Sequence, residues 1–215
     1  YLGDHALHGI LYDAHYEIIE TNVQDDHASV LLVHHYEGTD RGYPFPYKVE
    51  LKWVFYINNK ISVQTTITNL SQQPIPMMDG WHPYFKLGES INECSLQFQH
   101  KGMLEYNDAL IPTGAIVPNE QFNNSALILN THLDNGYLLD TKHPKCILEN
   151  EKYTLIIESN SAYPYLQLYT PENRKSIAIE NLSAAPDCFN NKMGLHIMQP
   201  QETWNLETSY QLINK

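Results

Sequence analysis

Three residues that lie far apart in the sequence have the types needed for proton-transfer chemistry. His82 is followed by Pro83, and a residue that precedes proline is pushed to an extended backbone. An imidazole held in this way suits a general acid near neutral pH, because its ordinary pKa is about 6.5. The same pattern fits a core histidine bonded to a backbone carbonyl, and the motif alone leaves both interpretations open.

Glu180 and His8 are the other two candidates. Glu180 ends a β-type run in which Ile177 and Ile179 face the opposite way, so its carboxylate would lie on a sheet face beside a loop. Without further support, a solvated glutamate is the simpler interpretation. His8 is followed by Gly9, which permits close approach of another group, but a surface histidine is again simpler. If the three converge, they supply a base, a helper and an acid.

Two polar residues have the character of hydroxyl-binding groups. Gln167 alternates with Tyr165 and Tyr169 along one face of a predicted strand, and such a face either binds sugar hydroxyls or is merely exposed. Asp134 precedes an Asn–Gly pair, which favours a turn in which the carboxylate only caps the backbone.

The composition excludes several classes of partner. The 215 residues contain 25 Asp and Glu against 13 Lys and Arg, and the only arginines are Arg41 and Arg174. Such an acidic chain repels nucleic acid, and it has few of the guanidinium groups that bind phosphate. No apolar run reaches the ~18 residues of a membrane helix. We therefore expect no nucleic-acid or membrane partner.

The three cysteines are widely spaced and form no CxxC pair, so the sequence predicts neither a disulfide framework nor a zinc site. Reduced thiols indicate a cytoplasmic protein. A periplasmic location stays open, because the sequence begins at Tyr1 and a targeting segment could precede it.

Short strands are predicted from end to end. Residues 49–57 and 61–67 alternate with period two around an Asn-rich turn, and residues 146–148 and 153–157 form a second hairpin. Further strands are expected at 165–169, 176–180 and 203–212, whereas 126–129 is the best short candidate for a helix. This pattern predicts an all-β sandwich in a single domain, residues 1–215.

Taken in order, these motifs resemble the aldose 1-epimerase (galactose mutarotase) family over nearly the whole chain, in its broad, less characterised branch. The elements that carry the resemblance are those at His8, Tyr43–Trp53, Asn69–Ser71, Gly80–Phe85, Asp134–Tyr137, Leu166–Pro171, Ile177–Asn190 and Gly194–Trp204. The combination is fairly specific, although each element alone is not.

The resemblance implies a large, mostly antiparallel β-sandwich whose concave face binds a sugar. It implies that His82 is the general acid, that Glu180 is the general base, and that His8 orients the sugar at the ring oxygen. Asp134 and Gln167 would hold substrate hydroxyls, with Asp140 as the alternative to Asp134.

We also expect Trp81 to contact the sugar. Two departures from the family stand out. The sequence starts just before the first histidine element, so the strands that normally precede it, with an arginine that reaches the site, either lie outside this sequence or are missing from this variant. We expect the first, because a sandwich without them would have open edges. That histidine is also followed by one glycine and then Ile10, rather than by two glycines.

The predicted function is interconversion of the α and β anomers of a free hexose. Anionic Glu180 would take the anomeric proton while cationic His82, sustained by Asp134, protonates the ring oxygen. No cofactor or metal is expected, the partner is a small sugar, and the protein is expected to be a monomer or homodimer. The alternatives are a non-catalytic carbohydrate-binding protein, a hexose 6-phosphate 1-epimerase, and a glycosidase that pairs Glu180 with Asp187.

Overall fold

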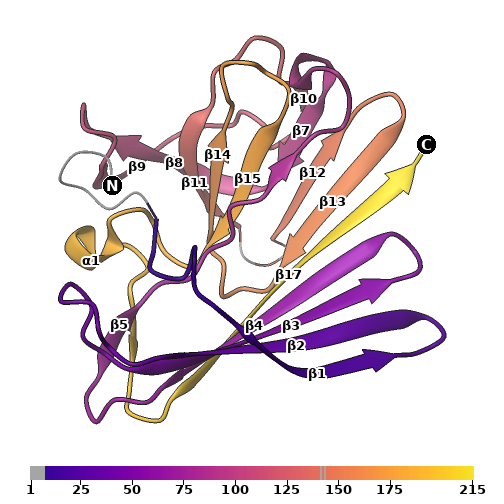
Figure 1. Ribbon diagram of the computed structural model, residues 1–215. Coiled ribbons are helices and arrows are strands. Elements are labelled where there is room, and N and C mark those ends of the chain that lie inside the picture. The colour runs from indigo at the N-terminus through magenta and orange to yellow at the C-terminus, as the bar shows by residue number, and fades with distance from the viewer. Residues whose placement is uncertain (1–7, 141, 143) are drawn as a thin grey trace.

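The computed structural model describes residues 8–140, 142 and 144–215, and it consists almost entirely of antiparallel strands (Figure 1). The largest sheet has nine strands, in the spatial order β1 (Glu17–Val23), β2 (His27–Tyr36), β3 (Tyr47–Tyr56), β4 (Lys60–Asn69), β17 (Thr203–Asn214), β13 (Tyr153–Ser159), β12 (Lys145–Glu149), β7 (Ser95–Phe98) and β10 (Ala126–Leu127). The predicted all-β, mostly antiparallel fold is therefore confirmed.

A second sheet has six strands, in the order β6 (Tyr84–Phe85), β15 (Ile177–Leu182), β14 (Tyr165–Tyr169), β11 (Asp134–Leu139), β8 (His100–Tyr106) and β9 (Pro112–Val117). A small two-stranded sheet pairs β16 (His196–Met198) with β5 (Ile75–Met77). In Figure 1 the six-stranded sheet lies against the β7 to β13 part of the large sheet, and β1 to β4 extend away from it.

Local sequence patterns account for both predicted hairpins. β3 and β4 pair in register from Tyr47↔Asn69 to Tyr56↔Lys60, and Asn59 takes the left-handed backbone conformation that the tight turn needs. β12 and β13 pair in the same way from Lys145 to Glu149. These hairpins were predictable because both the alternation and the turn chemistry are local.

The segment 126–129, the best short candidate for a helix in the sequence, is not helical. Ala126 and Leu127 form β10, which pairs with Leu96 and Ser95 at the edge of the large sheet. Sheet pairing overrides a weak local helical preference there. Among the described residues the α-helix is instead α1 (Cys188–Asn191), and a 3-10 turn spans Ile91–Glu93. No helix in the described ranges is long and apolar enough to cross a membrane.

Side-chain alternation packs one face of the six-stranded sheet against the large sheet. The main core contains Leu166, Leu168, Ile177 and Ile179 from the smaller sheet, and Leu96, Phe98, Leu148, Leu155 and Ile157 from the larger one. Because the period of a strand is two, the residues between these on β14 and β15 face away from the core. Gln167 and Glu180 are among them.

Candidate active site

Two rows of directly paired residues cross the outer face of the six-stranded sheet. The first row is Glu180, Gln167 and Gly136. The second row, two residues along each strand, is Tyr84, Ala178, Tyr169 and Asp134. Three neighbouring strands of the sheet thereby place a glutamate, a glutamine and an aspartate on one small area.

His82 reaches this face because its segment runs antiparallel to β15. The backbone hydrogen bonds that hold it are Ser183 N to Asp79 O at 2.9 Å, Trp81 N to Asn181 O at 3.1 Å and Ile179 N to Pro83 O at 3.3 Å. A β-bridge also joins Gly80 to Leu182. Proline lacks an N–H, but only its carbonyl is needed at that point of the ladder. The segment is thus tied to β15 on both sides of His82.

The imidazole and the carboxylate lie within contact distance. His82 Nε2 is 3.3 Å from Glu180 Oε1, with the glutamate side chain 10% exposed and the histidine side chain 36% exposed. Burial raises the pKa of Glu180 to about 7, and the charge of Asp134 adds to this. Glu180 is therefore a carboxyl group that can gain or lose a proton near neutral pH.

The pKa of His82 moves the other way. Burial lowers it, a backbone hydrogen bond partly opposes this, and His8 lowers it further. The rings of His8 and His82 meet edge-on with centroids 5.5 Å apart, and the ring of Tyr84 stacks on that of His82 at 5.1 Å. Asp134 thus acts on the pKa of Glu180, and the expectation that it sustains a His82 cation receives no support.

Asp134 and Gln167 are also joined. Gln167 Nε2 donates to Asp134 Oδ1 at 3.1 Å, and Gln167 Oε1 accepts from the hydroxyl of Tyr106 at 2.9 Å. The predicted Asn–Gly turn is wrong, because Asn135 and Gly136 lie inside β11. Asp140 follows the far end of that strand, so Asp134 is the aspartate beside Gln167.

Trp81 lies apart from the other candidates. Its indole meets Trp53 edge-on at 5.2 Å and donates from Nε1 to Thr65 Oγ1 at 3.3 Å. It packs with a second hydrophobic cluster that includes Tyr47, Ile67 and Tyr163 beneath β3 and β4. The structure thus brings together five of the six predicted site residues, whereas the side chain of Trp81 packs with the second cluster.

Tyr84, Tyr106 and Tyr169 belong to the same face and were not among the predicted site residues. Tyr84 is 51% exposed. Burial is the main cause of its raised pKa, and the charges of Tyr169 and Glu180 raise it further. The period-two pattern on 165–169 already placed Tyr169 beside Gln167. No local signal marks Tyr106, since its neighbours on this face come from other strands.

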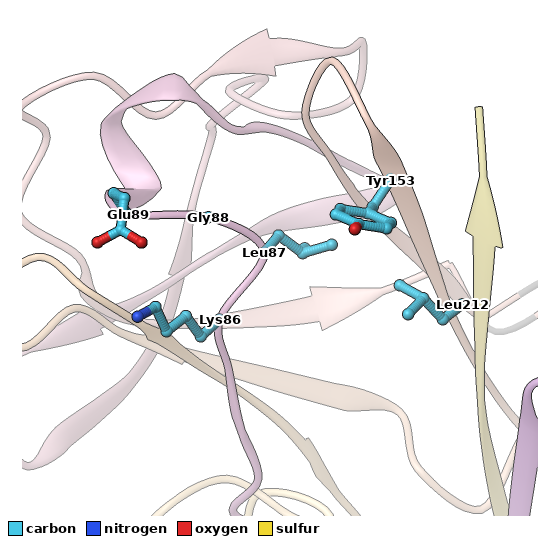
Figure 2. A pocket seen from close by; sticks show the side chains of 6 residues that line it. All are labelled: Lys86, Leu87, Gly88, Glu89, Tyr153 and Leu212. Atoms are coloured by element: carbon cyan, nitrogen blue, oxygen red, sulfur yellow. The ribbon is translucent and has the colours of Figure 1, made fainter.

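A separate hollow of about 410 Å³ lies away from these residues, between the segment after β6 and the ends of β13 and β17 (Figure 2). Its lining residues are Lys86, Leu87, Gly88, Glu89, Tyr153 and Leu212. It contains none of the candidate residues above, so it is not part of the candidate active site.

Comparisons with known proteins agree with this architecture. YihR of Escherichia coli (strain K12), itself described as an uncharacterized protein, is 22% identical over 200 residues. The match covers 90% of this chain and 63% of YihR, so the chain spans less than two thirds of that relative's length.

Two solved structures have the same fold. A galactose mutarotase-like protein from Clostridium acetobutylicum superposes with a TM-score of 0.85 at 18% identity, covering 97% of this chain and 69% of that one. A galactose 1-epimerase from Lactobacillus acidophilus NCFM superposes with a TM-score of 0.77 at 21% identity. That match covers 93% of this chain and 66% of the other. The family model for aldose 1-epimerase matches residues 2–211. The chain belongs to the aldose 1-epimerase family.

Proposed function

We propose that this protein interconverts the α and β anomers of a free aldose by general acid–base catalysis. The observation that carries the proposal is the 3.3 Å approach of His82 Nε2 to Glu180 Oε1 on a sheet face that also bears Asp134 and Gln167. Family membership supports the same reaction class.

The geometry suits ring opening at an anomeric carbon. The anomeric hydroxyl oxygen and the ring oxygen are bonded to the same carbon, so the groups that serve them must be neighbours. Glu180 takes the proton of the anomeric hydroxyl while His82 gives a proton to the ring oxygen, and the bond from the anomeric carbon to the ring oxygen breaks. The resulting carbonyl turns about the bond to its neighbouring carbon, and closure on the other face returns both protons.

The pKa shifts fit a reaction that must run in both directions. Burial raises the pKa of Glu180 to about 7 and lowers that of His82 below its ordinary value, so the carboxyl group competes with the imidazole for a proton near neutral pH. Acid–base catalysis is most efficient when the groups titrate near the working pH. Each group can therefore serve as the acid in one direction and as the base in the other.

The charges on this face favour a neutral sugar over a sugar phosphate. Glu180 and Asp134 are carboxyl groups, and the nearby rings are those of His8, His82 and Tyr84. Arg174 is engaged elsewhere, since its Nε, Nη1 and Nη2 donate to Asn92 Oδ1, Thr131 O and Leu129 O. Its guanidinium therefore serves as a clamp between loops, and a free aldose is the preferred substrate class.

The test is polarimetry on freshly dissolved α-glucose and α-galactose. The wild-type protein should speed the decay of optical rotation, and His82→Ala and Glu180→Gln should each lower that rate by roughly 100-fold or more. The matched controls are His27→Ala and Glu20→Gln, which change the same residue types on β2 and β1 of the other sheet. Wild-type rates in Glu180→Gln would overturn the base assignment.

The two main alternatives give different results in the same set of measurements. A non-catalytic sugar-binding protein would show a higher melting temperature with sugar but unchanged decay of optical rotation. A hexose 6-phosphate epimerase would accelerate anomer exchange of glucose 6-phosphate and not of glucose.

A further inference from the structure

A hydrogen-bond chain connects Tyr106 with two of the candidate sugar-binding residues. The hydroxyl of Tyr106, at the end of β8, donates to Gln167 Oε1 at 2.9 Å. The other end of the same amide, Gln167 Nε2, donates to Asp134 Oδ1 at 3.1 Å. The chain therefore runs from β8 to β14 and back to β11, which lies between them in the sheet.

Gly136 makes room for this chain. It lies on β11 directly opposite Gln167. A Cβ atom at this position would be 2.6 Å from the hydroxyl of Tyr106, closer than real Cβ contacts, and 3.0 Å from Gln167 Oε1, which is a tight contact. Glycine weakens a strand, so its presence at the centre of β11 is explained by the close approach of these two side chains.

The chain determines which way the amide of Gln167 points. A carboxylate only accepts hydrogen bonds, so Asp134 must face the NH₂ end of the amide. The hydroxyl of Tyr106 holds the opposite, carbonyl end. Without that donor the amide could rotate, and its NH₂ group could turn toward Glu180, which is directly opposite Gln167 on β15.

We propose that Tyr106 is a positioning residue of the sugar site, which acts through Gln167 on Asp134. It does not touch the reacting atoms: it holds the two groups that would bind the sugar hydroxyls. The kinetic consequence of this inference rests on the proposed function, whereas the hydrogen-bond chain itself does not.

Removing the hydroxyl should weaken substrate binding more than it slows the chemical step. Tyr106→Phe keeps the ring and deletes the donor, so we expect the KM for the aldose to rise about tenfold, with kcat changed by less than about threefold. Tyr153→Phe, which deletes a hydroxyl from β13 of the other sheet, is the matched control and should leave both constants unchanged.

A double-mutant cycle tests whether Tyr106 acts through Gln167. In a Gln167→Ala background, Tyr106→Phe should no longer change KM, because the group through which it acts is missing. Gly136→Ala inserts a methyl group between the two side chains and should reproduce the rise in KM with the Tyr106 hydroxyl still present. An unchanged KM in Tyr106→Phe, or an equal rise with and without Gln167, overturns the proposal.

A second readout does not depend on activity. In the wild-type protein the side-chain amide of Gln167 should give two well-separated proton signals in NMR, assigned by their absence from Gln167→Ala, and Tyr106→Phe should shift them while Tyr153→Phe should not. If no aldose is turned over, the proposed function fails while this measurement still decides the positioning role. If the amide signals of Gln167 do not shift in Tyr106→Phe, the positioning role of Tyr106 is overturned.

Discussion

His82 and Glu180 form a close pair across two segments that are separated by almost one hundred residues, with Nε2 and Oε1 3.3 Å apart. The backbone ladder between 79–85 and 177–183 makes this pair part of the sheet rather than of a loose loop. Sheet hydrogen bonds therefore set the spacing of the two groups before any sugar binds, and the following expectations depend on that arrangement.

The first prediction concerns the stability of the Glu180→Gln variant. The folded-state pKa of Glu180, about 7, lies above the ordinary value of 4.5, so the protonated form is favoured in the folded protein. The contribution of Glu180 to the free energy of unfolding is therefore fully present below pH 4.5 and is lost as the pH rises through 7. The loss has an upper bound of about 3 kcal/mol. Urea denaturation should find Glu180→Gln more stable than wild type at pH 8, with the advantage shrinking at pH 5. Equal advantages at both pH values would count against a buried, titrating carboxyl.

The second prediction concerns the pH profile of anomer exchange. The productive pair of Glu180 and His82 carries one proton, so kcat/KM should be bell-shaped, with the alkaline limb near pH 7. Asp134→Asn removes a negative charge that raises the pKa of Glu180, so the alkaline limb should move to lower pH. Asp140→Asn, beyond the far end of β11, is the control. An alkaline limb that stays in place in Asp134→Asn contradicts the electrostatic role of Asp134.

The third prediction concerns His8. Its ring lies 5.5 Å from that of His82. Burial is the main cause of the lowered pKa of His82, and the charge of His8 lowers it further. Replacing His8 with asparagine should therefore raise the pKa of His82, as followed by the NMR titration of its ring protons. His35→Asn, on β2 of the other sheet, should have no such effect. An unaltered His82 titration in His8→Asn would show that the two rings do not interact in solution.

The fourth prediction separates packing from sugar contact at Trp81. Phenylalanine at this position loses the indole N–H bond to Thr65 and part of the contact with Trp53, which should destabilise the protein by about 1–3 kcal/mol. The KM for the aldose should stay within about twofold of wild type, because the indole contacts Thr65 and Trp53 rather than the candidate sugar-binding residues. Chemical denaturation and polarimetry on one preparation check both. A raised KM with unchanged stability would place the indole in contact with the sugar instead.

The sequence predicted features that depend on local chemistry. Both hairpins follow from alternating side chains and turn residues, and the face of Glu180 follows from Ile177 and Ile179 on the other side of the same strand. One local pattern predicted the wrong structure. The Asn135–Gly136 pair has the composition of a turn, but it lies in a strand paired with β14. Its glycine leaves the space that Tyr106 and Gln167 occupy.

The sequence by itself determined the all-β class, the order of the motifs and the residue types available for acid–base chemistry, because these depend on alternation and on side-chain identity. Only the tertiary structure decided which residues meet: the pairing of His82 with Glu180, the chain from Tyr106 through Gln167 to Asp134, and the packing of Trp81 against Trp53. Strand pairing joins segments that are remote in the chain, and burial after that pairing sets the pKa values. Neither effect is encoded in the neighbours of any single residue.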